Sequence, residues 1–537
     1  MIEDARLIPT GTTLESDVCI VGAGAAGLIL ARECLGSRLS VTVLEAGGLR
    51  PDRETQSLLA GEAPNYWPLE HIRLACLGGT TRVWSGWCRP LEPSVFSQRP
   101  WLETDGWPFA RSELDPFYER AHEVCQLGPY EYRVDAWTSQ GAARLDLRED
   151  LIESALFHIS PTHFGKVYRS ELAGNPNVRV LLRAVAAELM SNESGSRVTH
   201  LQARTLSGTS FKIAARCYVL AAGGIENARI LLLSDRSRRC GLGNNNDLVG
   251  RNFTEHMYVT SGRLALGAQR PRMDFYWRHQ AAYGNKTGAL RGVFKLPSAR
   301  IEAEQLLNSA ILVLPPYESG WLLASRGARA LEFIGASVHR GWLPGDISRE
   351  FWELARDPVG AIAKGFGRLF RRRGLPRAVL LRAYCEPAPN TANRVTLMRS
   401  RDSLGRRRTR LVWRPGELEW KSIERTHELL NEAVRSAGLG RVERYSRDTG
   451  PAIEGGKHHM GTTRMHSDPQ RGVVDEHCRV HRVHNLFIAG SSVFPTAGFA
   501  NPTLTIVALA LRLADHLKAD LATGSARGRP ESAPSEQ

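Results

Sequence analysis

The chain has 537 residues, enough for two substantial domains or one large composite domain. Its 42% hydrophobic content is ordinary for a globular protein, and no window of about 18 uninterrupted apolar residues predicts a membrane-spanning helix. The formal net charge of +14 has no nucleic-acid recognition motif beside it, so we expect an arginine-rich surface, which would also favour anionic substrates.

The sequence carries no recognisable signal for export or for metal binding. The first residues, Met1 to Arg6, lack the basic and apolar segments of an export signal, so we predict a cytoplasmic protein. The nine cysteines are an odd number without a CxxC pair, which favours reduced and mostly buried thiols. The histidines near the C-terminus lack a regular ligand spacing, so we expect no metal site.

The N-terminal region has the pattern of a strand–helix–strand unit. An apolar run at residues 17–21 predicts a buried strand, residues 25–34 a helix, and residues 41–44 a second strand. The turn after the first strand reads Gly-x-Gly-x-x-Gly, which is typical of dinucleotide-binding units when it lies between a strand and a helix. Both conditions are met here.

Four residues of this unit have expected roles. Gly22 permits the tight turn, Gly24 lets the backbone approach a pyrophosphate, and Gly27 allows the helix to pack closely on the strand. Glu45 ends the second strand, 23 residues after Gly22, where its carboxylate can accept hydrogen bonds from a ribose. We therefore predict a dinucleotide site at this turn.

The next 200 residues extend the same sheet. Residues 61–110 are rich in Gly, Pro and Trp and indicate an ordered loop. Residues 178–210 predict a strand, a turn and a strand, and the apolar run at 217–221 predicts another strand followed by a helix over 225–233. Residues 256–447 then mix strands and helices in a different pattern, which favours a separate domain that shapes a substrate cavity.

The C-terminal region carries the most informative residues. His-His-Met-Gly-Thr at 458–462 is followed, 43 residues after its first histidine, by Asn-Pro-Thr-Leu-Thr at 501–505. Between them, residues 485–492 predict a short apolar strand that ends in small residues. The last helix, 504–519, is apolar almost all round and should be buried.

The two motifs supply a base and an amide. Hydride leaves a carbinol carbon more easily as the hydroxyl proton leaves, so the reaction needs a base with a pKa near neutrality, and His458 can be that base. Asn501 can donate a hydrogen bond to the substrate oxygen. Asn501 and Pro502 also have the pattern of the cap and first residue of the last helix. His459 is the rival base, but adjacent side chains generally point apart, so we expect it to be structural.

These motifs together resemble the glucose-methanol-choline (GMC) oxidoreductase family, and the Asn-Pro-Thr-Leu-Thr form is similar to that of pyranose-oxidase-like and related bacterial members. The resemblance covers the cofactor domain well and the middle of the chain loosely. The segments that carry it are Gly22–Gly27, Glu45–Gly48, Gly78–Thr81, Leu220–Arg229 and His458–Leu517.

The resemblance implies that the dinucleotide is FAD. It assigns His458 as the active-site base and Asn501 as the second catalytic residue. It also implies that residues 78–81 pack along the flavin, that Val185 lies by the adenine, and that Gly490 and Ser491 approach the pyrophosphate. The expected FAD contacts are Gly22, Gly24, Ala26, Gly27, Glu45, Ala46, Gly78, Gly79, Thr80, Thr81, Val185, Ala222, Gly223, Gly490, Ser491, Asn501, Pro502 and Thr503.

Three positions qualify the resemblance. Some relatives attach FAD covalently through a histidine just before the Trp of the loop after the glycines, but Val83 stands there, so we expect non-covalent FAD. His256 matches a family segment of mostly structural character and is not assigned to the site. Residues 362–373 have the pattern of a basic amphipathic helix, for which a half-buried helix is the expected structure and contact with a membrane surface or a subunit the alternative.

The predicted fold is α/β, with a Rossmann-like FAD-binding domain of GMC type and a mixed-sheet α+β substrate domain. The expected limits are 1–255 and 448–522 for the FAD domain, 256–447 for the substrate domain, and 523–537 for a disordered tail. The oligomeric state is not predicted.

The predicted function is oxidation of a CH–OH group of a small-molecule alcohol, sugar, glycoside or polyol. His458 takes the proton, flavin N5 takes the hydride, and oxygen or another acceptor reoxidises the flavin. Three alternatives remain: a dehydrogenase that uses a quinone or protein acceptor, a non-redox lyase on the same fold, and a flavin-binding protein without enzymatic activity.

Overall fold

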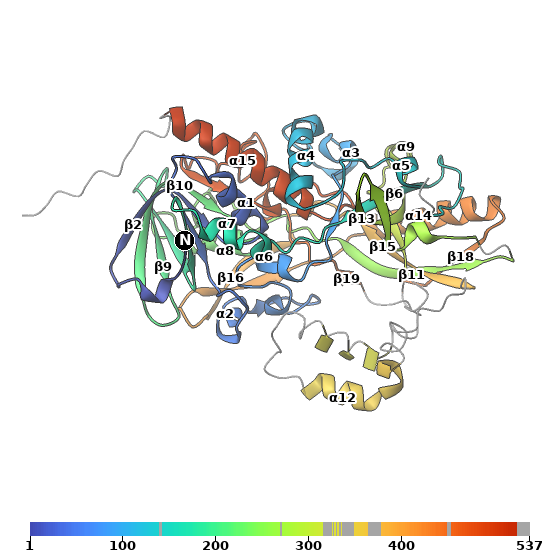
Figure 1. The fold of residues 1–537 in the computed structure, drawn as a ribbon, viewed down its shortest axis with the longest axis horizontal. Coiled ribbons are helices and arrows are strands. Elements are labelled where there is room, and N and C mark those ends of the chain that lie inside the picture. Colours follow the sequence, from blue (N-terminus) through green and yellow to red (C-terminus); the bar gives the residue numbers. More distant parts are fainter. Residues whose placement is uncertain are drawn as a thin grey trace, which may run out of the picture.

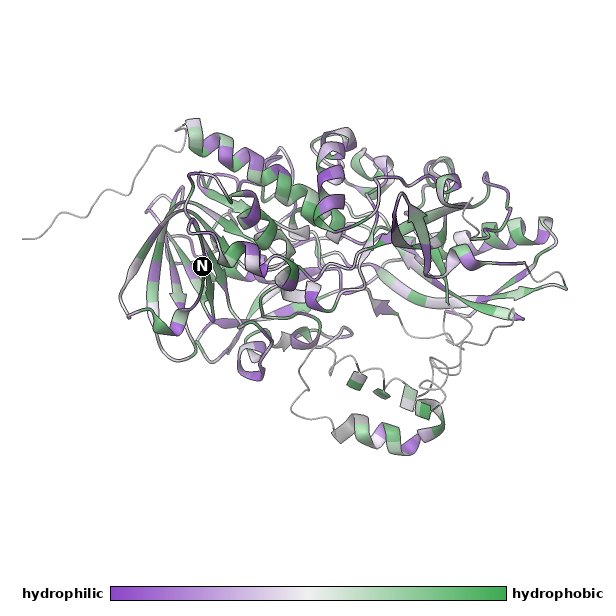
Figure 2. Cartoon of the chain, viewed as in Figure 1, coloured by the Kyte–Doolittle hydropathy of each residue, from purple (hydrophilic) through white to green (hydrophobic). Residues whose placement is uncertain are grey.

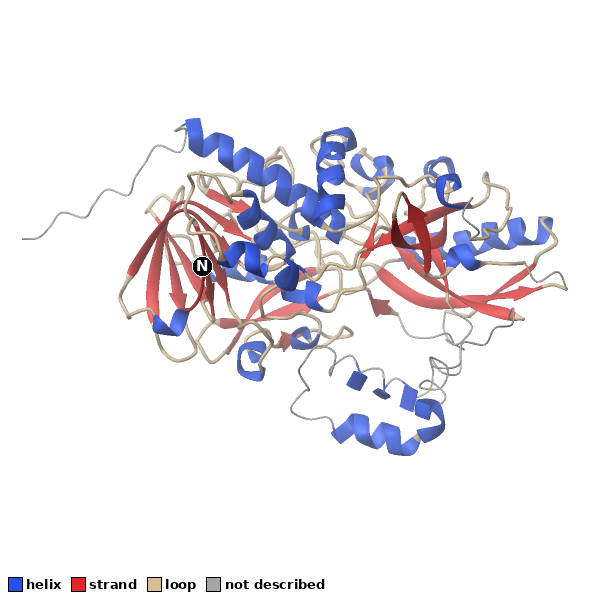
Figure 3. Ribbon diagram, in the orientation of Figure 1, coloured by secondary structure: helices blue, strands red, loops and turns tan. Residues whose placement is uncertain are grey.

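The computed structural model describes residues 1–138, 142–268, 271–314, 348–362, 377–447 and 453–523, with a few residues between 325 and 335. The expected tail and most of the basic segment 362–373 lie outside the described residues. Figures 1 and 3 show two large sheets at opposite ends of the molecule, with the longest helices along one side.

The first sheet is the predicted dinucleotide-binding sheet. Its main path runs β1-β7-β3-β2-β10-β9-β8, with β20 also paired to β10. The pairs on the β1 side and the β10–β20 pair are parallel, whereas β8, β9 and the start of β10 form an antiparallel meander. The bounds are β1 Ile2–Asp4, β2 Thr13–Val21, β3 Val41–Glu45, β7 Val178–Leu182, β8 Val185–Ser191, β9 Val198–Arg204, β10 Ser210–Leu220 and β20 Leu486–Ile488.

Helices cover this sheet as the apolar patterns predict. Helix α1 (Ala25–Glu33) packs against the last helix, α15 (Thr503–Thr523), and α15 packs against α4 (Asp115–Val124). Helix α8 (Glu226–Leu233) follows β10 and lies against β8. Figure 2 shows α15 becoming more hydrophilic toward its outer end, where the chain leaves the core. The predicted fold class is confirmed.

The second sheet is antiparallel and forms the other end of the molecule. Its path is β18-β11-β15-β14-β13-β6-β5, with β12 paired to β13 and β19 to β11. Helix α14 (Glu417–Ser436) packs on β14, β15 and β18. The bounds are β5 Trp87–Cys88, β6 Glu153–Ile159, β11 Met257–Leu266, β12 His279–Tyr283, β13 Lys286–Lys295, β14 Ser309–Val313, β15 Ala378–Cys385, β18 Gly440–Arg444 and β19 Glu454–Gly455.

A small third sheet joins distant parts of the chain. Strand β4 (Gly61–Glu62) pairs in parallel with β17 (Arg407–Val412), which pairs with β16 (Arg394–Arg401). Strand β16 packs against α8 of the first domain. Sheet membership therefore crosses the expected domain limits, because β16 and β17 fall within 256–447 while β5 and β6 of the second sheet fall within 1–255. A sequence pattern predicts a strand but not its partner.

Two further observations concern what the described residues contain. None of their helices combines the length and apolar character that crossing a bilayer requires. All nine cysteines are free thiols, and only Cys240 is exposed.

Candidate functional site

One cavity of about 630 Å³ is lined by residues from both large sheets. The expected dinucleotide contacts meet here, because the turn after β2, the segment after β10 and the segment after β20 all lie at the carboxyl ends of parallel strands. Every residue predicted to contact the cofactor lines this cavity except Gly27 and Gly78.

These two glycines allow backbone segments to pack closely beside the residues that line the cavity. A Cβ on Gly27 would lie 1.9 Å from the Gly22 carbonyl oxygen, so any side chain would force α1 off the strand. A Cβ on Gly78 would lie 2.8 Å from the Gly165 nitrogen, and its φ of +92° is in the left-handed region. Both residues therefore shape the cavity without lining it.

The cavity wall fits an extended dinucleotide at three glycines. A Cβ on Gly24, Gly223 or Gly490 would meet no atom within 4 Å, although all three line the cavity. Their bare backbone therefore leaves room where a pyrophosphate would approach. Gly24 also occupies the cap position before α1, and the N-terminal end of this helix attracts negative charge.

Glu45 is buried at the same end of the cavity. Its Oε2 accepts a hydrogen bond from the Ala23 amide at 3.1 Å, and its Oε1 accepts one from the Gly47 amide at 2.9 Å. Burial raises the pKa of this carboxyl to about 7. Since a carboxylate has about four lone-pair positions, Glu45 holds the glycine turn and can still accept hydrogen bonds from a ribose.

The two predicted catalytic residues lie side by side in the lining of this cavity. His458 Nε2 is 3.2 Å from Asn501 Nδ2, and both residues line the cavity. Burial, followed by the neighbouring His256, His459 and Lys457, holds the pKa of His458 well below its usual value. His458 is therefore a neutral imidazole at pH 7, as a proton acceptor must be.

The Asn501 side chain contacts the base instead of capping the helix. Helix α15 begins at Thr503, and the Ile506 amide donates to the Pro502 carbonyl at 2.9 Å, so Pro502 occupies the cap position predicted for Asn501. Asn501 Oδ1 is buried and has no hydrogen-bond partner among the described residues. This orphaned acceptor belongs to a residue that lines the cavity beside His458.

A cluster of buried polar residues contacts both the backbone and the ring of His458. The His458 amide donates to both carboxylate oxygens of Glu255, at 2.9 and 3.0 Å, and the Tyr66 hydroxyl donates to the same carboxylate. His256 Nδ1 lies 2.8 Å from His458 Nδ1, and the two rings meet edge to face. His256, which the sequence did not assign to the site, is therefore in direct contact with the predicted base.

His459 faces a different environment, as expected for an adjacent residue. Its ring packs near Tyr66 and Phe253, with centroids 6.1 and 5.8 Å away. Its carbonyl accepts a hydrogen bond from the Ser491 hydroxyl at 2.7 Å. Within the described part of the chain its Nε2 has no partner, and the residue borders the cavity without contacting Asn501.

Aromatic side chains and one arginine line the cavity near the second sheet. Trp84, Trp87 and Tyr258 lie there, and Tyr258 also packs on Tyr384 at 5.4 Å. Arg382 stands on β15 opposite Thr260 and makes no side-chain hydrogen bond or ion pair with any described residue. Flat apolar faces beside a guanidinium that has no partner in the described part of the chain suit a ring with several oxygen substituents.

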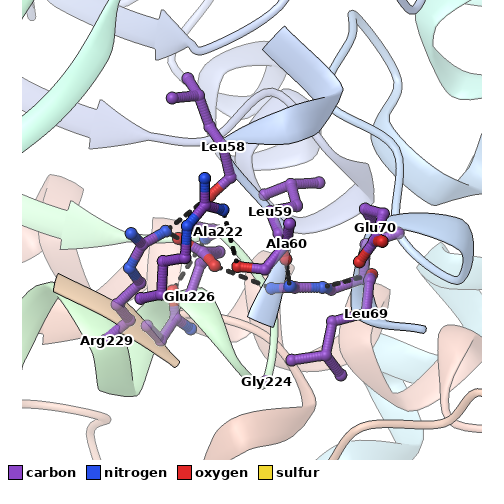
Figure 4. A network of polar contacts seen from close by, with 12 residues as sticks. Leu58, Leu59, Ala60, Leu69, Glu70, Ala222, Gly224, Glu226 and Arg229 are labelled. Carbon is purple, nitrogen blue, oxygen red and sulfur yellow. Dashed lines mark hydrogen bonds and ion pairs between the residues drawn. The ribbon is translucent and has the colours of Figure 1, made fainter. Parts of the chain in front are cut away.

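A buried ion network borders the cavity at α8 (Figure 4). Glu226 accepts from Arg73 at 2.8 Å and pairs with Arg229 at 3.4 Å, and Arg229 continues to Asp402 at 2.9 Å. Arg406 also contacts Asp402, at 2.9 Å. The network joins the loop around Arg73, α8 and the β16–β17 turn into one unit.

Comparison with known proteins is consistent with this geometry. The model of the GMC oxidoreductase C-terminal domain matches residues 389–510, and that of FAD-dependent oxidoreductases matches residues 17–238. The chain is 25% identical to the fructose dehydrogenase large subunit of Gluconobacter japonicus, over 95% of this chain and 99% of that protein. It is 26% identical to the 6'''-hydroxyparomomycin C oxidase of Streptomyces lividus, over 94% and 92%.

The structure is also similar to a solved flavoenzyme. The pyridoxine 4-oxidase from Mesorbium loti superposes with a TM-score of 0.54 at 17% identity, over 93% of this chain and 98% of that one. At this identity the likeness concerns the fold alone.

Proposed function

Since the chain belongs to the GMC oxidoreductases, FAD-dependent enzymes that act on CH–OH donors, we propose that it oxidises a secondary or primary hydroxyl of a sugar, glycoside or polyol to a carbonyl. FAD, when bound, supplies the acceptor for the hydride. The residues of the chain bind the substrate, orient its hydroxyl and take its proton.

The observation that carries this proposal is the pair formed by His458 and Asn501. With Nε2 and Nδ2 3.2 Å apart on the cavity wall, one hydroxyl oxygen can contact both groups. His458 Nε2 accepts the hydroxyl proton as the C–H bond gives up its electron pair, and Asn501 hydrogen-bonds the oxygen during the change from alcohol to carbonyl. The pKa of His458 lies below the near-neutral value expected from the sequence, but the neutral ring that results can accept a proton at pH 7.

The sugar-like substrate class is supported by the second sheet's side of the cavity. Trp84, Trp87 and Tyr258 offer flat faces to the C–H bonds of a ring, and Arg382 offers donors to its oxygens. Two relatives are named as a fructose dehydrogenase and a 6'''-hydroxyparomomycin C oxidase, and the substrates in both names are polyhydroxylated compounds. One is called a dehydrogenase and the other an oxidase, so we propose reoxidation of the flavin by oxygen or by another acceptor.

The test is anaerobic bleaching of the flavin by a panel of sugars, glycosides, polyols and simple alcohols. We expect bleaching by a polyhydroxylated member, and a loss of bleaching in H458N. H477N is the matched control, because His477 lies in the same C-terminal segment but is partly exposed and away from the cavity. Yellow, folded protein that no panel member bleaches contradicts the substrate class, and H458N that bleaches normally contradicts the role of the base.

Oxygen admitted after bleaching distinguishes the acceptor. Rapid return of the oxidised spectrum with hydrogen peroxide identifies an oxidase. A spectrum that stays bleached in air and recovers with a quinone identifies a dehydrogenase.

A further inference from the structure

We infer that His256 is a positioning residue that fixes the proton of neutral His458 on Nδ1, and so leaves Nε2 as the lone pair that faces the cavity. The inference rests on the proposed function for the identity of His458 as the base. It follows from a chain of three hydrogen bonds, each of which restricts the next.

The chain begins at a backbone carbonyl. His256 Nε2 lies 2.8 Å from the Gly498 oxygen, and a carbonyl oxygen can only accept, so His256 Nε2 carries a proton. Gly498 is itself fixed, because its amide donates to Glu386 at 3.1 Å and Glu386 is bound by both terminal nitrogens of Arg99, at 2.6 and 2.7 Å. With φ at +58° and a Cβ position 2.8 Å from Val95, this residue must be glycine.

The second bond follows from the first. A neutral imidazole has one donor and one acceptor nitrogen, so a proton on His256 Nε2 makes its Nδ1 an acceptor. Because His256 is fully buried, the charged form that would donate from both nitrogens is disfavoured. The 2.8 Å contact between the two Nδ1 atoms needs one proton, and His458 must supply it.

The third bond then has a defined direction. With its proton on Nδ1, His458 has a lone pair on Nε2, which accepts from Asn501 Nδ2 at 3.2 Å in the resting site. When substrate enters, its O–H bond breaks and an Nε2–H bond forms, while the hydrogen of the C–H bond leaves with the bond's electron pair as hydride, for which FAD would be the acceptor when bound. The resulting imidazolium keeps its Nδ1–H bond to His256, which thus acts as the carboxylate does in a catalytic triad.

The unpaired Oδ1 of Asn501 is the reason that the proton of His458 must be held on Nδ1. If His458 carried its proton on Nε2, a rotated Asn501 amide could accept that proton at Oδ1, which now has no partner among the described residues. That arrangement would satisfy both groups and block the base. The acceptor on His256 favours the reactive tautomer over this competing one.

Other groups around the cluster do not set the proton position. Glu255 binds the backbone amide of His458, not its ring. Tyr258 faces the ring at 6.0 Å, and its hydroxyl interacts with Asn501. The charge of Lys457 lowers the pKa of His458. His459 turns toward Phe253.

The tautomer can be read directly, without a substrate. Holoenzyme labelled with [15N]histidine gives long-range proton–nitrogen correlations that distinguish protonated from unprotonated ring nitrogens, and comparison with H458N identifies the His458 signals among the 16 histidines. We expect an unprotonated Nε2 and a protonated Nδ1 in the wild type. H256L should shift His458 to the Nε2-protonated form or to a mixture.

Two variants make the result interpretable. H256N places an amide oxygen near the former Nδ1 and should restore the wild-type pattern, because it again offers an acceptor. H427L removes another buried histidine, one that contacts Ser261 at 2.7 Å away from this cavity, and should leave the His458 signals unchanged. His458 protonated at Nε2 in the wild type, or unchanged in folded, FAD-containing H256L, overturns the inference.

A kinetic readout adds to the spectra once the panel supplies a substrate. H256L should lose much of the general-base contribution, which is about 10²- to 10⁴-fold in the rate of flavin reduction, with a small change in KM. H256N should recover most of that rate. Equal rates in H256L and the wild type contradict the inference, whereas failure of every panel substrate concerns only the proposed function.

Discussion

His458 and Asn501 meet at 3.2 Å on the cavity wall although 43 residues separate them in the chain. Strand β20 (Leu486–Ile488) lies between them in sequence and pairs with β10, so the dinucleotide-binding sheet itself positions one residue relative to the other. The two residues are therefore held by the same framework that would hold the cofactor, which fixes the site of proton removal beside it.

Replacing Asn501 tests its part in that arrangement. N501A should slow anaerobic flavin reduction by roughly 10²-fold or more, since it removes a hydrogen bond that stabilises the changing charge on the substrate oxygen. FAD content, measured by absorbance after purification, should change little, because many other residues of the cavity lining would still contact the cofactor. An unchanged reduction rate would rule out the role.

Gly24 allows FAD binding to be separated from folding. Its φ of −79° suits any residue, and a Cβ would meet nothing within 4 Å, so G24A should fold normally. The added methyl group points into the space expected for the pyrophosphate, and we expect the purified protein to hold clearly less FAD. G174A, at an exposed glycine of ordinary φ, is the control and should keep its flavin.

The attachment of FAD should be non-covalent. Val83 lines the cavity at the position where a histidine would be needed, and it has no nucleophilic atom. Precipitation with acid should therefore release all of the yellow colour into the supernatant. Flavin that stays with the washed protein pellet would contradict this prediction.

The network in Figure 4 predicts an effect on stability instead of on catalysis. Arg229 is fully buried and contacts both Glu226 and Asp402. R229M leaves these carboxylates short of a partner in the core, which should cost about 3–5 kcal/mol of the free energy of unfolding.

Urea denaturation followed by fluorescence measures that cost. R236M is the matched control, because Arg236 pairs with Glu188 but is 68% exposed in its side chain, and it should change stability by less than about 1 kcal/mol. Equal effects of the two variants would mean that the buried network contributes no more than a surface pair.

The sequence predicts the parts of the site that have local signals. The turn Gly22–Gly27, Glu45 and the two C-terminal motifs all have characteristic residues at short spacing, and the cavity gathers nearly all of them. His256 has no such signal, because its partner lies 202 residues away and only the start of β11 brings it to His458. Arg382 was missed for a similar reason, since strand pairing decides which residues of β15 face the cavity.

Strand partners far apart in the sequence also explain why the sheets cross the predicted domain limits. Strands β16 and β17 have ordinary strand patterns, but β4, the second partner of β17, is only two residues long and lies more than 300 residues earlier. Short non-local strands contribute too few residues to reveal their register. The division of the chain between its two domains therefore stays a prediction at those segments.

Buried carboxyl groups should give the protein a defined dependence of stability on pH. Complete burial alone would raise the pKa of Glu386, but the charge of Arg99 outweighs it. The folded pKa of Glu386 is therefore about 2, below the usual 4.5. Its contribution is full above pH 4.5 and is lost as the pH falls toward 2. Glu226, held by Arg229 and Arg73, acts in the same direction with a pKa of about 2.

Two other carboxyl groups act in the opposite direction. Burial raises the pKa of Glu45 and of Glu255 to about 7, so their contribution is present below pH 4.5 and is lost as the pH rises toward 7. Buried histidines such as His256 and His458, whose pKa values burial lowers, contribute stability above pH 6.5 that is lost as the pH falls, and they outnumber these two carboxyl groups. The free energy of unfolding of the FAD-free protein should therefore fall mainly toward acid pH. Urea titrations at a series of pH values measure the profile.

Variants identify which group causes the loss of stability below pH 4.5, here called the acid limb of the profile. E386Q leaves Arg99 buried without its charged partner, so stability at pH 7 should fall and the loss below pH 4.5 should become shallower. E417Q is the control, because Glu417 pairs with Arg447 but its side chain is 82% exposed. This variant should leave the pH profile of stability nearly unchanged. An acid limb of the same steepness in E386Q and the wild type would show that the Arg99–Glu386 pair is not its source.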